Sequence, residues 1–206
     1  AATDPLVRNY YDTEWGKPVT SEQGVFERLV LESFQSGLSW STILKKRQAF
    51  RTAFASFIPE AVAAFTDQDR ERLMQDAGIV RNKRKIDAAI TNARAAIALR
   101  GALAAEADAH RAGRMGEAPL THLLRPRRSY PRHLGELVWL YQPNHQPRPK
   151  NAGEVPAQTE ESRALSLELK RRGFVFVGPV TALALMSAIG ITNTDIIGTW
   201  KRPLAE

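Results

Sequence analysis

The sequence predicts an all-α protein, and three observations lead to this prediction. Apolar residues recur every three or four positions along almost all of the 206 residues, which is the spacing of amphipathic helices. Residues that favour helix starts (Ser, Thr, Asn and Pro) and glycines that favour helix ends flank these stretches. We find no two neighbouring stretches with strand-like alternation, so we expect no β-hairpin.

The first predicted helix lies in TSEQGVFERLVLESFQSG, residues 20–37. Thr20 and Gln23 have the spacing of a capping box at its start. Gly37 is expected to end it, because glycine adopts the left-handed conformation that closes many helices. Its buried face should be the apolar stripe formed by Val25, Phe26, Leu29, Val30 and Phe34.

A second helix is expected to begin at Ser39 or Trp40. Four of its residues should point inward, namely Ile43, Leu44, Phe50 and Phe54. Its basic residues should lie mostly on the outer surface: Lys45, Lys46, Arg47 and Arg51. Pro59 then begins a short helix, because proline is tolerated in the first helical turn.

Residues 66–97 predict a helix, a tight turn and a second, basic helix. Thr66 is the expected N-cap of the first helix, and Gly78 is expected to end it in a left-handed conformation. Asn82 is the expected N-cap of the second helix, which buries Ile86, Ala89, Ile90 and Ala93.

The rest of the chain predicts less regular structure. Residues 101–132 loosen into an alanine-rich and then basic stretch, which we interpret as an insertion or a mobile basic segment. Residues 143–156 contain four prolines and predict a connecting loop. Two last helices are expected over residues 159–172 and 180–189, each followed by glycine. We therefore expect one domain of two helical lobes, over residues 1–206.

Composition narrows the classes of function. Lys and Arg number 29 against 22 Asp and Glu, which gives a net charge of +7 and favours a polyanionic partner, although a basic surface can also serve solubility alone. Cysteine is absent, so disulfides, thiol nucleophiles and thiolate metal ligands are excluded. No apolar run approaches the roughly 18 residues of a membrane span. We expect a soluble, intracellular protein without membrane contact.

The turn DAGIVRNKRK, residues 76–85, has the chemistry of a phosphate site. A hairpin that leads into a helix N-terminus presents free backbone N–H groups and the positive end of the helix dipole. We therefore predict DNA contacts by Gly78, Arg81, Lys83 and Lys85. The alternative is an ordinary helix corner with a solvated basic face.

The stretch ESFQSGLSW, residues 32–40, and the stretch YYDTEWG, residues 10–16, are candidates for a pocket. Glu32 falls at the margin of the apolar stripe, where partial burial would raise its pKa, although it can equally be a surface residue like Glu27. Trp40 can be a core aromatic. Tyr10, Tyr11 and Trp15 precede the first predicted helix, which is harder to explain by core packing.

Six motifs follow one another along the chain: YYDTEWG, LESFQSGLSW, QDAGIVRNKRKI, TNARA, NHQP and LKRRGFVFVGP. Together, and in this order, they resemble the 3-methyladenine DNA glycosylase I family of the helix-hairpin-helix superfamily. The resemblance implies a compact orthogonal helical bundle. It also implies base-excision repair: alkylated duplex DNA is bent, the damaged nucleotide is extruded, and the N-glycosidic bond of N3-methyladenine is hydrolysed without an organic cofactor or strand cleavage. Whether N3-methylguanine is also released stays open. With the resemblance we expect a monomer of bacterial type in the cytoplasm, associated with the nucleoid.

The resemblance assigns roles to individual residues. Glu32 matches the active-site glutamate that hydrogen-bonds the alkylated base and stabilises positive charge developing on the sugar. Tyr10 and Trp40 match the aromatic residues that stack on that base, with Trp15 close by. Gly37 and Leu38 match the turn that enters the gap in the duplex.

The sequence departs from the family at its structural zinc site, which uses two cysteines and two histidines. Tyr11 stands where a histidine is usual, and Asp195 and Thr199 stand where the C-terminal histidine and cysteine would be. We therefore predict no metal and no cofactor, and expect Tyr11, Ile196, Ile197 and Trp200 to join the chain ends by packing. The loss also leaves an alternative function open: a DNA-structure binder without excision activity or with an altered substrate. A protein-interaction scaffold is a more distant alternative.

Overall fold

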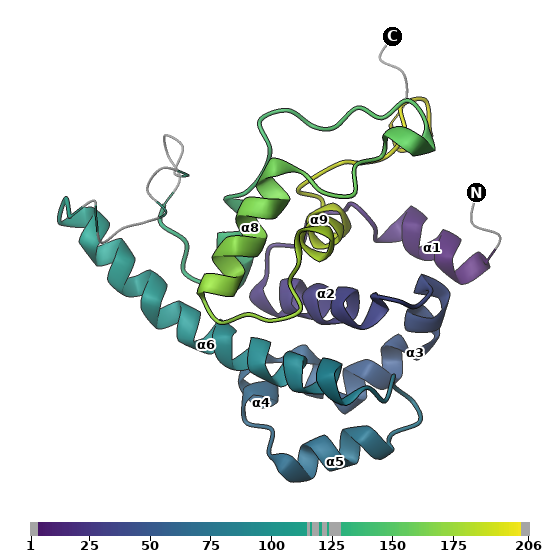
Figure 1. The fold of residues 1–206 in the computed structure, drawn as a ribbon, viewed down its shortest axis with the longest axis horizontal. Helices are drawn as coiled ribbons and strands as arrows, with labels where there is room; N and C mark the ends of the chain where they lie inside the picture. The colour runs from purple at the N-terminus through teal and green to yellow at the C-terminus, as the bar shows by residue number, and fades with distance from the viewer. Residues whose placement is uncertain (1–3, 115, 117–119, 121–122, 124–128, 203–206) are drawn as a thin grey trace.

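The computed structural model describes residues 4–114, 116, 120, 123 and 129–202, and this part of the chain is helical without strands (Figure 1). The all-α prediction is therefore confirmed. Two 3₁₀ turns, Ala55–Phe57 and Ala152–Glu154, accompany the helices α1 (Pro5–Thr13), α2 (Glu22–Gln35), α3 (Trp40–Ala53), α4 (Pro59–Ala63), α5 (Asp67–Gln75), α6 (Lys83–Arg111), α7 (Leu134–Trp139), α8 (Glu160–Arg171) and α9 (Pro179–Ala188).

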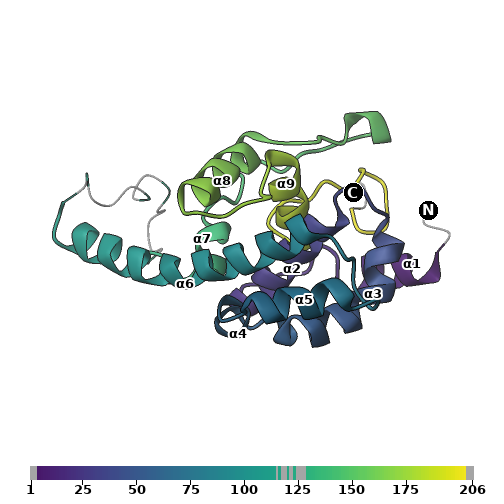
Figure 2. The same ribbon diagram turned by 60° about the horizontal axis from the view of Figure 1, so that its bottom comes forward.

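Helix α2 lies in the middle of the molecule and contacts α3, α6, α7 and α9 (Figures 1 and 2). The five residues of its predicted apolar stripe are all buried. The ring of Phe34 on this helix packs against those of Phe50 and Phe54, whose centroids lie 4.8 and 5.9 Å away. Burial of these rings is a main source of stability, since each fully buried Phe contributes roughly 1.5–3 kcal/mol. No helix in the described part is long and apolar enough to cross a bilayer.

Several predicted helix boundaries are confirmed. Ser39, Thr66 and Asn82 are the N-caps of α3, α5 and α6. Gly173 and Gly190 follow α8 and α9 with φ angles of +87° and +82°, as expected of helix-ending glycines. The predicted connecting loop at residues 143–156 contains no α-helix and a single 3₁₀ turn.

The start of α2 differs from the predicted capping box. Ser21 is the N-cap, and its Oγ accepts a hydrogen bond from Gly24 N at 3.2 Å. Gln23 instead donates through Nε2 to the backbone oxygen of Ser56 at 2.7 Å. A long-range partner therefore competes successfully with the local capping contact.

The prediction missed helix α1 and also α7. Tyr10 and Tyr11 were expected outside regular structure, but both lie in α1. The helix has only nine residues, and Tyr10 alone among them is buried, so it lacks a long buried stripe like that of α2. Asp4, whose carboxylate accepts from Leu6 N, and the following Pro5 form a start signal that the apolar pattern alone does not contain.

The segment 101–132 does not begin as a loosened stretch. Helix α6 continues through Gly101 to Arg111, and the buried residues Leu103 and Ala109 hold its end against the core. Glu106 strengthens this attachment by accepting a hydrogen bond from the Tyr130 hydroxyl at 2.7 Å. The remainder of the proposed insertion falls largely on residues outside the described part of the chain.

Candidate active site

Three aromatic side chains meet at one end of α2. Tyr10 comes from α1, Trp15 from the turn after it, and Trp40 is the first residue of α3. The rings of Tyr10 and Trp40 stack with a centroid distance of 5.3 Å, and Trp15 lies edge-on to both at 6.1 and 6.5 Å. The structure thus brings the three predicted base-binding residues together.

A cavity of about 400 Å³ opens beside these rings. Its volume falls in the range of roughly 300–1000 Å³ typical of small-molecule sites. The walls come from α1 and the turn after it, the start of α3, the connecting loop and the C-terminal segment. The lining residues are Val7, Tyr10, Tyr11, Trp15, Trp40, Val155, Thr194, Asp195, Ile196 and Thr199. The site therefore depends on how the two ends of the chain are joined.

Glu32 lies in the last turn of α2 and is buried, with 3% of its surface exposed. Its Oε1 atom finds no hydrogen-bond donor among the described residues. Burial raises its pKa to about 8, against the opposing charge of Arg28. The alternative that Glu32 is a surface residue is therefore wrong. A buried carboxylate oxygen without a partner is rare and costly, and it favours a functional explanation.

Glu32 does not itself line the cavity, but its charge acts on Tyr10. Burial and then the negative charge of Glu32 raise the pKa of the Tyr10 hydroxyl. Tyr10 is also buried and forms the cavity wall. Tyr10 therefore both lines the cavity and lies close enough to Glu32 to be affected by its charge.

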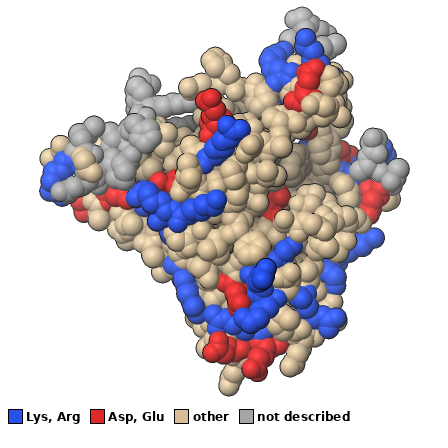
Figure 3. Space-filling view, in the orientation of Figure 1, with Lys and Arg blue, Asp and Glu red and all other residues tan. Residues whose placement is uncertain are grey.

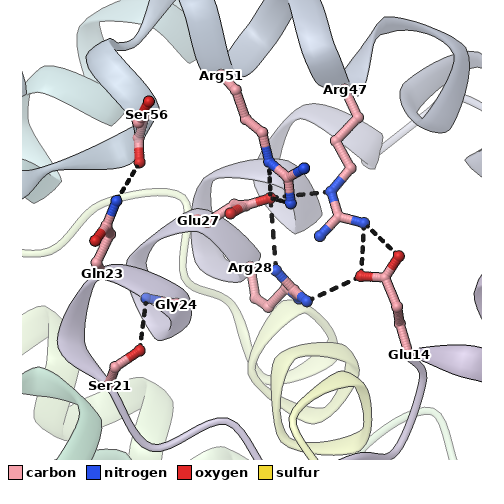
Figure 4. A network of polar contacts seen from close by, with 9 residues as sticks. All are labelled: Glu14, Ser21, Gln23, Gly24, Glu27, Arg28, Arg47, Arg51 and Ser56. Atoms are coloured by element: carbon pink, nitrogen blue, oxygen red, sulfur yellow. Dashed lines mark hydrogen bonds and ion pairs between the residues drawn. The ribbon is translucent and has the colours of Figure 1, made fainter.

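Five charged residues form a cluster of polar contacts (Figure 4). The charges of Arg28, Arg47 and Glu14 act on Tyr10, and that of Arg28 also acts on Glu32. Arg47 Nη1 contacts both carboxylate oxygens of Glu14, at 2.7 and 2.9 Å, and Arg47 Nε donates to Glu27 Oε1 at 2.9 Å. Arg28 and Arg51 also contact Glu27, at 3.5 and 2.9 Å. We call Glu14, Glu27, Arg28, Arg47 and Arg51 the charge cluster.

The charge cluster corrects two sequence-based expectations. Arg47 was expected on the outer surface but is only 7% exposed, and Glu27, taken as a typical surface residue, is buried as well. Both are buried because each satisfies the charge of the other. Sequence reasoning missed the cluster, although Glu14 stands within the quoted stretch YYDTEWG and Arg28 precedes Glu32 by one helical turn.

The turn after α2 projects a single apolar side chain. Gly37 has a φ angle of +81°, a left-handed conformation that suits glycine. Gln35 Nε2 donates to the backbone oxygen of Leu38 at 2.8 Å, which fixes the turn. Leu38 is 38% exposed at this end of the helix.

The predicted DNA-binding hairpin connects α5 to α6. Gly78 is not in the left-handed conformation that was expected, because α5 already ends at Gln75 with Asp76 as its C-cap. Glycine is instead required there by space, since a Cβ atom would lie 2.9 Å from both the Ala49 Cβ and Asp76 Oδ1. Gly78 N donates to Asp76 Oδ1 at 2.7 Å, which closes the turn.

The basic residues of the hairpin have different environments. Arg81 and Lys83 are exposed, and Lys83 pairs with Asp87 at 2.7 Å. Lys85 donates to the backbone oxygens of Phe34 and Ser36, at 2.9 and 2.6 Å, and so joins α6 to the end of α2. In Figure 3, Lys and Arg side chains gather at the lower right, over the beginning of α6 and neighbouring α3.

The chain ends meet beside the cavity. The Tyr11 hydroxyl donates to Asp195 Oδ1 at 2.7 Å, and the Tyr11 ring contacts that of Trp200 edge-on at 6.3 Å. The ammonium of Lys201 lies 4.1 Å from the centroid of the Tyr11 ring. We call Tyr11, Asp195, Trp200 and Lys201 the terminal clasp. Of the expected packing residues, Tyr11 and Trp200 do meet, and the polar contact with Asp195 was not foreseen.

The residues that stand at the positions of the family's zinc ligands do not fit a zinc ion. Structural zinc sites use Cys and His ligands, whereas Tyr11, Asp195 and Thr199 offer oxygen atoms alone. Tyr11 and Asp195 are also engaged with each other. Among the described residues, no group of three or more His, Cys, Asp or Glu side chains is placed to hold a metal.

Replacing Tyr11 by phenylalanine should lower the free energy of unfolding by about 1–2 kcal/mol, because a hydrogen bond to a charged group is lost. Urea denaturation of Tyr11→Phe, Asp195→Asn and the double variant measures the coupling between the two side chains. Additive effects of the two single changes would show that this contact does not join the chain ends.

The chain is similar to known proteins in sequence and in fold. A family model described as methyladenine glycosylase matches residues 1–112 and 121–202. The chain is 40% identical over 198 residues to DNA-3-methyladenine glycosylase 1 of Escherichia coli (strain K12), an alignment that covers 95% of this chain and 90% of the relative.

Solved structures of similar proteins share the fold. A crystal structure of 3-methyladenine DNA glycosylase I has a TM-score of 0.78 and 35% identity, covering 98% of this chain and 97% of that one. A tyrosine-to-phenylalanine variant of 3-methyladenine DNA glycosylase I in complex with 3-methyladenine has a TM-score of 0.78 and 29% identity, covering 100% and 96%. From the family match, the close relative and the shared fold, it follows that this chain belongs to the methyladenine glycosylase family.

Proposed function

We propose that this protein is a monofunctional DNA-3-methyladenine glycosylase that excises N3-methyladenine from alkylated duplex DNA by hydrolysing the N-glycosidic bond. The observation that carries the proposal is the buried carboxylate of Glu32. One of its oxygens has no hydrogen-bond donor among the described residues, and its charge acts on Tyr10, which lines an aromatic pocket. Membership of the methyladenine glycosylase family supports the same substrate.

The chemistry of the lesion matches this site. N3-methyladenine is cationic while it is attached to the sugar and leaves as a neutral base, so little acid catalysis is required. Recognition of the cation is then the main task. The aromatic faces of Tyr10, Trp15 and Trp40 attract a cation, and the Glu32 carboxyl supplies a negative charge in a site of low polarity once it is ionised.

Entry of the base requires a rearrangement of the pocket. A base that lies between two rings needs a gap of about 7 Å, twice the usual contact distance of about 3.5 Å. The Tyr10 and Trp40 centroids are only 5.3 Å apart. We therefore propose that a base stacked between them separates the two rings.

Duplex DNA would contact the same end of the molecule. Leu38 is the proposed wedge, held outward by the turn at Gly37. Arg81 and Lys83, with the backbone near Gly78, are the proposed phosphate contacts. Lys85 joins the two regions, since its ammonium binds the carbonyls just before the Leu38 turn.

The proposal involves no metal and treats the protein as a monomer. The terminal clasp would take the place of the family's zinc site in joining the chain ends. Metal analysis of the purified protein tests this point, and stoichiometric zinc would contradict it.

Release of free base from alkylated duplex DNA tests the function directly. The wild type should release N3-methyladenine, and chromatographic separation from N3-methylguanine and N7-methylguanine defines its lesion range. Glu32→Gln should release it more slowly at pH 8, although the activated leaving group permits residual activity. A folded protein that binds the DNA but releases no base would instead indicate a DNA-structure binder.

The pH dependence of the same reaction identifies the group involved. At pH 6 nearly all Glu32 in the free protein holds its proton, and at about pH 8 half of it is ionised. Since kcat/KM reports the ionisation of the free enzyme, it should rise about 50-fold over this interval if the ionised form recognises the base. Glu32→Gln should lack this rise.

Charge reversal tests the hairpin. Arg81→Glu and Lys83→Glu should each weaken binding to undamaged duplex DNA. Each should also reduce the slope of log K against log salt concentration by about one, the value for one lost phosphate contact. Lys150→Glu, an equal charge change in the exposed connecting loop, is the control. The hairpin assignment is wrong if all three variants bind with the same affinity and salt slope.

A further inference from the structure

Two arginines lie near Tyr10, which lines the pocket that is proposed to receive a cation. The positive charges of Arg28 and Arg47 both act on the Tyr10 hydroxyl, and that of Arg28 also acts on Glu32. The Arg47 guanidinium lies 5.8 Å from the centroid of the Tyr10 ring. Left without partners, these charges would repel a cationic base and would attract the carboxylate meant to bind it.

Arg28 is well placed to pair with Glu32 but does not. It precedes Glu32 by four residues on α2, a spacing at which opposite charges on a helix approach each other. Its guanidinium is turned toward Glu14 instead, with Arg28 Nη2 3.2 Å from Glu14 Oε2. Glu32 Oε1 stays without a donor among the described residues.

Glu14 is the carboxylate that holds Arg28 in this orientation (Figure 4). It follows α1 directly, and its backbone N–H donates to the backbone carbonyl oxygen of Tyr10 at 2.9 Å. The other nearby acid, Glu27, is already shared by three arginines and is 3.5 Å from Arg28. Without the Glu14 charge, Arg28 would keep only this longer, shared contact.

We propose that Glu14 is a positioning residue, which holds Arg28 away from Glu32 and thereby keeps the Glu32 carboxylate free for a cationic base. This inference rests on the proposed function for the role of Glu32, but the geometry of Arg28 is independent of it. The groups that act on Glu32 or on neighbouring Tyr10 are Arg28 from α2, Arg47 from α3 and Glu14 itself.

The test compares Glu14→Gln with the wild type. Loss of the Glu14 charge allows Arg28 to pair with Glu32, and an adjacent cation favours the ionised carboxylate. The pKa of Glu32, measured by ¹³C NMR of labelled free protein, should fall by at least one unit from about 8. At pH 8, kcat/KM for release of N3-methyladenine should fall about tenfold or more, because the carboxylate is neutralised by Arg28.

Arg28→Met in the Glu14→Gln background supplies the decisive control. It removes the competing cation, so base release should return to within about threefold of the Arg28→Met single variant. Glu14→Asp, which keeps the charge on a shorter side chain, should give intermediate values and serves if Glu14→Gln does not fold. An unchanged or higher Glu32 pKa in Glu14→Gln would overturn the proposal, as would a double variant no more active than Glu14→Gln.

The NMR titration separates this inference from the proposed function. It uses free protein and needs no base release. If the wild type releases no base but the Glu32 pKa still falls in Glu14→Gln, the function fails while the positioning of Arg28 stands. If the wild type is active but the pKa does not fall, the positioning role fails while the function stands.

Discussion

Replacing Glu32 by glutamine is expected to stabilise the free protein on the order of 4 kcal/mol at pH 9 and to change its stability little at pH 4. The reason is the raised pKa of Glu32, about 8 in the folded state against an ordinary value of 4.5. Below about pH 4.5 the carboxyl is protonated in both states, and burial carries no charge penalty. As pH rises from 4.5 to 8, the unfolded chain loses the proton that the folded protein retains, so stability falls.

Urea denaturation at several pH values between 4 and 9 measures this effect. The difference between Glu32→Gln and wild type should grow steadily up to about pH 8 and then level off, because both states of the wild type are ionised above that value. Glu71→Gln, which neutralises an exposed carboxylate on α5, is the matched control and should show no such trend. A constant difference across the range would mean that Glu32 is not an isolated buried carboxylate.

Such a stability cost is consistent with a binding role. A carboxylate without a hydrogen-bond donor destabilises the free protein, but the same carboxylate gains the full interaction when a cation enters the pocket. The Glu32 site therefore gives up stability in the free state for affinity in the bound state. An arginine that satisfied Glu32 permanently would stabilise the fold and occupy the recognition group.

The parts of this structure that depend on local sequence could be predicted. The stripe of α2, the cap at Asn82 and the glycine after α8 all follow from spacing within about one helix. The burial of Glu32 could not, because what covers the margin of α2 depends on elements distant in the sequence, such as Tyr10 on α1.

The charge cluster shows the same limit more sharply. Glu27 and Arg47 are 20 residues apart, and each looks like a surface residue in its own helix. They are buried because α2 and α3 pack with these two side chains facing each other. A prediction from hydrophobic periodicity uses the polarity of each residue alone. It therefore places a charged residue on the surface, even where a charged partner distant in the sequence allows the residue to be buried.

Replacing Arg47 by methionine is expected to cost up to about 3 kcal/mol of stability, because two other arginines still contact Glu27. Methionine fills much of the same space, but the Glu27 carboxylate then loses a close partner at 2.9 Å in a buried site. Removing one partner of a buried ion pair costs roughly 3–5 kcal/mol when the remaining charge is left uncompensated, but Arg51 and Arg28 stay 2.9 and 3.5 Å from Glu27 and reduce this cost. The free energy of unfolding at pH 7, measured by urea denaturation, gives the size of the loss.

Arg51→Met is the matched control, because Arg51 contacts the same Glu27 oxygen at 2.9 Å with a side chain that is 39% exposed. Exposed ion pairs contribute roughly 0–1 kcal/mol, so this change should be small. Glu27→Leu combined with Arg47→Met should recover much of the loss, since an apolar pair needs no compensation. If Arg47→Met and Arg51→Met cost the same, water must reach Glu27, and burial of the charge cluster would not explain its arrangement.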